Sequence, residues 1–324
     1  MRERLTITPE RYAQVTLIAL GALSLIVLTG AAVRLTGSGL GCPDWPKCYG
    51  GTVPPLETHA VIEYGNRLLT GFVGLAVIAA SVGAFFRKPF RGHLALFGAL
   101  LPVGVLGQAI LGAFVVKHHL APELVMGHFI LSMLLLDAAF ALAWCARYEP
   151  GERRFSTDRL GVWAVRALIP IGQLTILAGT ISTGSGPHAG AHEGELVQRF
   201  DFEGTGTLEW VVQRHSAMAA VFGIAAIAVW LLLRRRGGDS RAVRPLTVVI
   251  ALLAVQGVVG AVQWSLELPA ELVWLHITLA TATWLAMLWT VATAGRLEPR
   301  ESRAAPSSEA HAKPDSPAPA LTQT

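Results

Sequence analysis

Eight long apolar segments divide the chain, with the polar residues gathered between them. The segments run over residues 12–33, 60–86, 94–116, 121–146, 161–182, 208–233, 245–264 and 271–294. Each is long enough to cross the hydrocarbon core of a membrane, about 30 Å thick, as a helix that rises about 1.5 Å per residue. Only 15% of the residues are charged, against roughly 25% in soluble proteins. The sequence therefore predicts an all-α membrane protein with eight transmembrane helices.

Basic residues are distributed unevenly between the two ends of these segments. Nineteen of the 26 Lys and Arg residues precede the first segment, follow the eighth, or lie in the loops after the second, fourth and sixth. Cytoplasmic loops carry such an excess, so we expect a cell-membrane protein with both termini in the cytoplasm. The first segment is too long for a cleavable signal peptide and is expected to be retained. The net charge of +4 reflects this asymmetry and gives no reason to expect nucleic-acid binding.

Short motifs recur at a spacing of 147–149 residues. The repeated pairs are Glu123-Leu-Val-Met-Gly-His128 with Glu271-Leu-Val-Trp-Leu-His276, Gln108 and Gly112 with Gln256 and Gly260, Thr36-Gly-Ser-Gly39 with Thr183-Gly-Ser-Gly186, and Asn66 with His215. This spacing predicts a tandem duplication. We expect two pseudo-symmetric four-helix bundles, residues 1–146 and 161–295, related by an axis along the membrane normal. A cytoplasmic linker, 147–160, would join them, and a disordered cytoplasmic tail, 296–324, would follow.

Four of these polar side chains lie at similar depth near the outer ends of the even-numbered segments: Asn66, His128, His215 and His276. An imidazole inside an apolar helix is costly unless something binds it. Two histidines on neighbouring helices of one bundle can bind a haem iron from both sides, which predicts a haem between His215 and His276. In the first half Asn66 is a poor iron ligand, so an iron bound by His128 would keep one coordination position open. Interhelical hydrogen bonds are the alternative, and copper or zinc would need more clustered ligands.

The first outer loop and the second segment add further candidates. Cys42 and Cys48 predict a disulfide on the outer face, either structural or redox-active, whereas a metal pair would lack partner ligands nearby. Glu63 is a candidate catalytic group, because a charge at membrane depth costs about 2.5–3.5 kcal/mol. Arg67 and Arg214 lie on the side that is poor in basic residues. They are candidates for contacts with haem propionates, with snorkelling to the interface as the alternative.

Taken together, these motifs resemble the haem A synthase family over roughly residues 12–294. The resemblance implies that haem b is held by His215 and His276, and that haem O in the N-terminal bundle has a methyl group oxidised to a formyl group near His128. It also implies that Glu63 is essential and that Cys42 and Cys48 form a disulfide. The family has Glu-x-x-His on the second helix, where this chain has Asn66. We expect His128 alone to hold the substrate haem, with Asn66 offering a hydrogen bond.

The resemblance also implies partners. The substrate is haem O, supplied by a haem O synthase, and the reaction needs an electron donor and an oxidant that the sequence does not identify. Membrane lipid surrounds the protein, and association with a second copy of the chain stays open. The alternative function is a non-catalytic b-type cytochrome that carries electrons; a transporter would show a similar internal repeat.

Overall fold

The computed structural model describes residues 6–149, 152, 156–192, 197–237 and 241–297, so the predicted disordered tail from residue 298 onward lies outside the described residues. Eight long helices account for most of the described chain: α1 (Pro9–Leu35), α2 (Thr58–Phe86), α3 (Gly92–Lys117), α4 (Pro122–Arg147), α5 (Arg159–Ser185), α6 (Thr207–Arg235), α7 (Val243–Ser265) and α8 (Ala270–Ala294). A short 3-10 helix, η2 (Gly204–Gly206), precedes α6. All eight long helices meet the length and composition of membrane spans. The predicted multi-pass all-α membrane fold is confirmed, with each helix reaching at most a few residues beyond its apolar segment.

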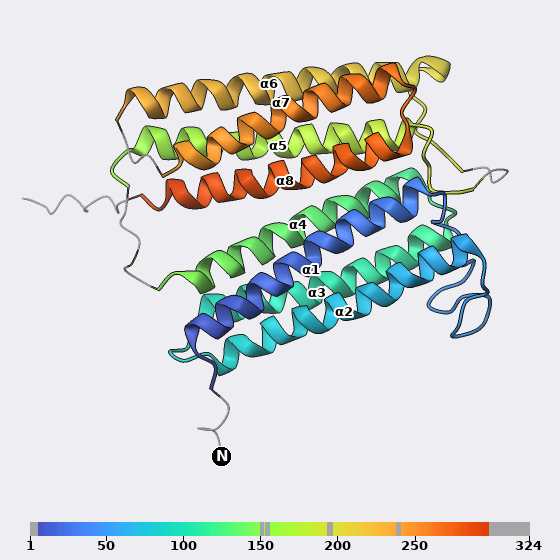
Figure 1. Ribbon diagram of the computed structural model, residues 1–324, viewed down its shortest axis with the longest axis horizontal. Helices are drawn as coiled ribbons and strands as arrows, with labels where there is room; N and C mark the ends of the chain where they lie inside the picture. The colour runs from blue at the N-terminus through green and yellow to red at the C-terminus, as the bar shows by residue number, and fades with distance from the viewer. Residues whose placement is uncertain (1–5, 150–151, 153–155, 193–196, 238–240, 298–324) are drawn as a thin grey trace, which may run out of the picture.

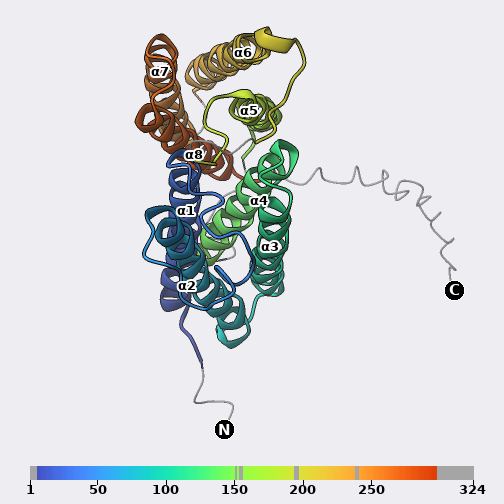
Figure 2. The ribbon, with the colours of Figure 1, turned by 90° about the vertical axis from the view of Figure 1, so that its right-hand side faces the viewer.

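The helices pack in two groups of four (Figures 1 and 2). In the first group each helix packs against the next in the chain, and α1 packs against α4 to close the ring; α5–α8 repeat the pattern, with α5 against α8. Contacts of α1 and α4 with α8, and of α4 with α5, join the groups. Consequently α2 and α4, like α6 and α8, occupy opposite corners of their group. The predicted arrangement as two separate bundles, and the pseudo-twofold relation between them, stays a prediction.

The turn between α2 and α3 is fastened to the end of α4 by a buried cation. Arg87 is 0% exposed and forms an ion pair with Glu149. Arg91 donates a hydrogen bond of 2.9 Å to the carbonyl oxygen of Tyr148. The charge pattern placed Arg87 among loop cations in water, but the structure buries it, because its pairing with Glu149 offsets the loss of hydration.

At the opposite end of the molecule, the repeated Thr-Gly-Ser-Gly segments of the two groups meet. Arg34 donates a hydrogen bond of 2.8 Å to the carbonyl oxygen of Thr183, and the amide of Gly39 donates one of 2.7 Å to the carbonyl oxygen of Gly190. Gly37 has a φ of +67°, and a Cβ added there would lie 2.9 Å from the carbonyl oxygen of Ala191. Glycine is required because a side chain would be strained and would collide with the facing loop.

Candidate functional site

Two imidazoles face one another across the interior of the second group. His215 on α6 and His276 on α8 have ring centroids 6.3 Å apart, with the ring planes at 72°. Since α6 and α8 are at opposite corners, these side chains reach toward each other through the middle of the group. Imidazole nitrogens bind transition metals at about 2 Å, so two rings on either side of one ion have centroids roughly 6 Å apart. The observed separation fits that arrangement.

Neighbouring residues hold the two rings in place. The Nδ1 atom of His215 lies 3.1 Å from the carbonyl oxygen of Thr175, so Nδ1 carries the hydrogen and Nε2 keeps its lone pair. A Cβ added to Gly179 would approach Cε1 of this ring to 2.9 Å, and one added to Gly260 would lie 3.4 Å from Cε1 of His276. These glycines make room for the imidazoles, because a side chain at either position would crowd the ring.

His276 retains an unused polar atom. Its Nδ1 is buried without a hydrogen-bond partner, and its Nε2 lies 3.4 Å from Nε2 of Gln256. Gln256 is itself anchored, because its Oε1 accepts a hydrogen bond from the hydroxyl of Thr283. A buried polar atom without a partner is costly. Because the amide nitrogen of Gln256 can only donate, Nε2 of His276 accepts this long contact, and a metal could replace it at that lone pair. The pair His215 and His276 therefore offers one Nε2 lone pair from each ring inside an apolar helix group, which suits a metal bound from two sides.

The first group has one imidazole in the corresponding place. The ring of His128 on α4 lies against Gly112, with 3.5 Å between Cε1 and an added Cβ, just as His276 lies against Gly260 at the repeat spacing. Nδ1 of His128 is buried without a partner. Gln108 donates hydrogen bonds to the carbonyl oxygen of His128 and to the hydroxyl of Ser132. This backbone anchoring leaves the imidazole of His128 available to a ligand.

Asn66 lies beside a cavity between α1 and α2. The cavity has a volume of about 240 Å³ and is also lined by Thr29, Ala32, Val33, Ile62, Gly65 and Leu69. The side-chain oxygen of Asn66 is buried without a hydrogen-bond partner. Its surroundings are apolar apart from Thr29, so this oxygen is a ready acceptor for a ligand that enters the cavity.

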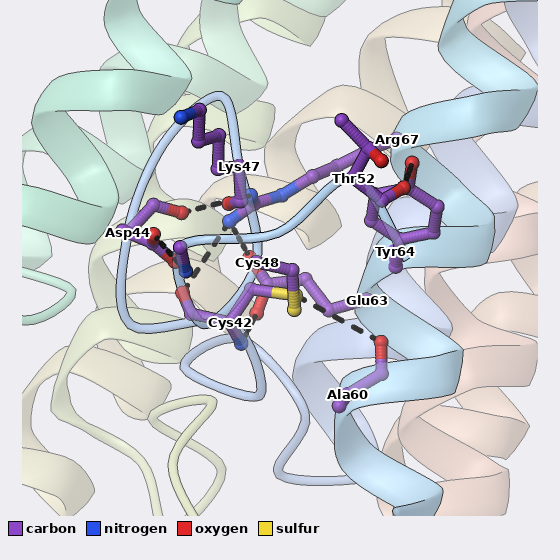
Figure 3. The surroundings of a disulfide bond; sticks show 10 residues. Cys42, Asp44, Lys47, Cys48, Thr52, Ala60, Glu63, Tyr64 and Arg67 are labelled. Carbon is purple, nitrogen blue, oxygen red and sulfur yellow. Dashed lines mark hydrogen bonds and ion pairs between the residues drawn. A yellow bond between two sulfur atoms is a disulfide. The ribbon is translucent and has the colours of Figure 1, made fainter. Parts of the chain in front are cut away.

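Glu63 contacts the outer loop directly through one carboxylate oxygen and, through the other, the Arg67 side chain that also binds this loop (Figure 3). It is 6% exposed. Its Oε2 accepts a hydrogen bond of 2.7 Å from the amide of Cys42, and its Oε1 pairs with Arg67 at 2.5 Å. Cys42 and Cys48 form a disulfide with their Cα atoms 4.8 Å apart, which confirms the predicted bond. The carboxylate, the guanidinium and the disulfide loop thus form one connected unit.

The two arginines proposed for propionate contacts have other partners here. Arg67 donates to the carbonyl oxygens of Asp44 and Lys47, both at 2.9 Å, and so binds the disulfide loop. The guanidinium of Arg214 lies 3.5 Å from the ring centroid of Trp210, on the exposed side of α6. Neither contact involves the imidazole pair. Their role toward a propionate stays a prediction.

Residues 13–191 match the sequence profile of the family described as cytochrome oxidase assembly protein. The match covers more than half of the 324 residues. The chain belongs to this family. The matched region contains Glu63, Asn66 and His128, whereas His215 and His276 lie beyond it. The assignment of the imidazole pair in the second group therefore rests on the repeat and on the geometry described above.

Individual relatives carry more specific names. A protein named Heme A synthase from Lysinibacillus sphaericus is 28% identical over 164 residues, which are 48% of this chain and 53% of the relative. A Heme A synthase from Alkalihalophilus pseudofirmus is 34% identical over 157 residues, 47% of this chain and 49% of the relative. A Protoheme IX farnesyltransferase from Thermus thermophilus is 26% identical over 281 residues, 83% of this chain but 46% of the relative. The chain spans about half the length of these curated relatives.

Sequence reasoning missed three polar contacts near the site. Asp137 accepts a hydrogen bond from the indole of Trp284, and a lone carboxylate inside an apolar segment could have drawn attention to it. His188 is half-buried and lies 2.7 Å from the carbonyl oxygen of Leu268. His59, in the first turn of α2, stacks on His192 with centroids 5.3 Å apart. No local pattern predicts the last two contacts, because each joins segments that are far apart in the chain.

Proposed function

We propose that this protein is a haem A synthase, which oxidises a methyl group of haem O to a formyl group. The observation that carries the proposal is the pair of facing imidazoles, His215 and His276, in a chain of the cytochrome oxidase assembly family. The names of two relatives support the same activity. Among the described residues, no group of three or more His, Cys, Asp or Glu side chains could hold a metal ion. A porphyrin needs only the two axial donors, since its own nitrogens provide the rest.

Haem b is the group that we place between His215 and His276. When bound, it supplies one-electron chemistry that the side chains lack. The chain's own part is to fix the two rings. The contact with the Thr175 carbonyl sets the tautomer of His215, and Gly179 and Gly260 leave the space that each ring occupies. Held by both His215 and His276, a haem would supply electron transfer and not substrate oxidation.

Haem O, the proposed substrate, would bind in the first group. His128 offers one imidazole, and Asn66 offers an amide oxygen in place of a second. We keep Glu63 as the candidate for holding or moving a proton during the reaction. Its two oxygens are held by the Cys42 amide and by Arg67, so the disulfide loop fixes where this carboxylate lies.

We place the protein in the cell membrane with both termini in the cytoplasm. The start of α1 and the end of α8 lie at one end of the molecule, and the Cys42–Cys48 loop lies at the other (Figure 1). A disulfide is typical of an oxidising compartment, which puts the proposed haem sites near the outer face. The similarity to a Protoheme IX farnesyltransferase supports a haem O synthase as the source of the substrate. The electron donor and the oxidant are further partners of the reaction.

The test is pigment analysis after expression in a host that makes haem O and lacks its own haem A synthase. We expect purified protein with a Soret band, extractable haem b, and haem A in the host membranes. Glu63→Gln should abolish haem A and keep haem b, whereas Glu123→Gln, at an exposed position on α4, should preserve both.

Other outcomes separate the alternative functions. Bound haem without haem A from the wild-type protein would favour the electron-carrying cytochrome. A colourless preparation would favour a transporter. Conversion of haem b to haem O with farnesyl diphosphate would instead assign the chain the activity named for the Thermus relative.

A further inference from the structure

A cavity of about 460 Å³ lies at the outer end of the second helix group. Its lining comes from the ends of α5, α6 and α7 and from the loops between them, and includes Ser185, Pro187, Arg199, Leu208, Trp264 and Glu267. Arg199 belongs to the loop between α5 and α6, in the part of it that the structure describes. None of these residues takes part in the function proposed above.

The cavity lies outward of the imidazole pair on two of the helices that surround the pair. On α6, Leu208 lies seven residues before His215, which is two turns and about 10 Å along the same helix face. On α7, Trp264 lies four residues after Gly260, the residue against which the His276 ring lies, and so one turn further out on that face. A flat molecule bound between the two rings could therefore extend one edge into this cavity.

The cavity wall carries a cation without a carboxylate partner. Arg199 donates a hydrogen bond of 2.8 Å to the carbonyl oxygen of Pro187, and no described carboxylate lies within ion-pair distance of it. Partial burial lowers the pKa of Arg199, which means that its charge has lost hydration that an anion could replace.

The surroundings of Arg199 are also positive. Arg34 is close enough for the two guanidinium charges to repel each other, and Nε of Arg34 is buried without a hydrogen-bond partner. The opposing charge in the cavity wall is one carboxylate, Glu267, which is exposed as Arg199 is, so water screens both charges alike. The two guanidinium charges of Arg199 and Arg34 outnumber the carboxylate of Glu267, which favours an anionic ligand group at this end of the cavity.

We propose that Arg199 binds a propionate carboxylate of the haem held between His215 and His276. This inference rests on the function proposed above. A haem carries its two carboxylates on one edge, and that edge must leave the apolar helix interior. The cavity lies on the outer side of both imidazoles, and Arg199 provides a donor pair that suits a carboxylate. Arg199 thus takes the role that the sequence suggested for Arg67 and Arg214.

The test compares Arg199→Gln with Lys117→Gln in purified, haem-loaded protein. Lys117 is exposed on the same side of the membrane, at the end of α3, and its replacement removes the same charge. Arg199→Gln should lower the midpoint potential of the bis-imidazole haem, because a nearby cation disfavours the ferric form. It should also release haem to apomyoglobin roughly fivefold faster, as expected for the loss of one ion pair. Glu267→Gln should raise the potential, and Lys117→Gln should change neither quantity.

Each failure has its own meaning. If Arg199→Gln binds haem with the wild-type potential and release rate, or if Arg214→Gln alone produces the shift, the assignment of Arg199 is wrong while the haem site stands. If the wild-type protein binds no haem, the proposed function fails first. Arg199→Lys separates charge from geometry: it should restore the potential and recover the slow release only in part, because lysine lacks the two-pronged donor.

Discussion

The indole nitrogen of Trp284 on α8 donates a hydrogen bond of 2.6 Å to the carboxylate of Asp137 on α4. The two residues are 147 apart in the chain, within the spacing of the internal repeat. A contact between near-equivalent positions is what a twofold axis between α4 and α8 would produce. Asp137 follows His128 by nine residues and Trp284 follows His276 by eight, so the contact lies roughly 12–14 Å below both imidazoles. It joins the two helix groups inside the membrane.

This contact should contribute measurably to stability. Trp284→Phe removes the donor and leaves Asp137 without its partner, while Asp137→Ala removes the acceptor. Polar contacts between membrane helices are worth about 0.6 kcal/mol on average and at most about 1.7 kcal/mol. We therefore expect a coupling energy of about 1 kcal/mol in a double-mutant cycle of the free energy of unfolding in detergent. Strictly additive effects would show that the contact does not stabilise the fold.

Removal of either facing imidazole should disrupt the haem b site. His215→Ala and His276→Ala should each lower the haem b content of purified protein at least tenfold, a loss typical of disrupted metal sites. Absorption and electron paramagnetic resonance spectra would report the loss of the six-coordinate signal. The control is His93→Ala, since His93 is exposed at the start of α3. Unchanged spectra in both single variants would place the haem elsewhere.

The first group should accept a second axial ligand when Asn66 is replaced. Asn66→His puts an imidazole where the repeat has His215, so we expect a new low-spin haem signal and tighter retention of haem in this group. Conversion of haem O should fall, because the open position is closed. Asn66→Gln keeps an amide and should leave the spectrum as in the wild type. If Asn66→His behaves like Asn66→Gln, residue 66 does not face the substrate iron.

The Glu63→Gln substitution can separate the chemical role of this residue from its structural role. Glu63→Gln still accepts the hydrogen bond from the Cys42 amide but cannot hold a transferable proton. We expect haem A formation to fall at least about a hundredfold, with haem b and the disulfide intact. Thiol labelling before and after reduction would verify the Cys42–Cys48 bond. Full activity in Glu63→Gln would reduce Glu63 to a support for the outer loop.

The disulfide should stabilise the outer loop. Closing a loop of this length contributes about 2 kcal/mol in the chain-entropy model. Replacement of Cys42 and Cys48 by serine should lower the free energy of unfolding by about that amount, and it should free Glu63 from the Cys42 amide. Reductant should destabilise the wild-type protein and have no effect on the double variant. Equal sensitivity of both proteins would mean that the bond is not formed in the membrane.

The sequence by itself determined the membrane fold and the inventory of the candidate site. Length and hydropathy are local properties, so the eight helices could be predicted to within a few residues. The repeat singled out His128, His215 and His276 because an imidazole is too costly at that depth to recur by accident. The Cys42–Cys48 disulfide also followed from short spacing in a single loop.

Tertiary structure decided which of these groups meet. The 6.3 Å separation of His215 and His276 depends on α6 and α8 occupying opposite corners, and no pattern within either helix specifies that. Glu63 reaches the Cys42 amide only because the outer loop folds back over α2. Arg87 is buried, Arg199 lines a cavity and Asp137 reaches Trp284 for the same reason. Each of these contacts joins segments far apart in the chain, and their partners are chosen by packing between helices and loops, not by the local sequence.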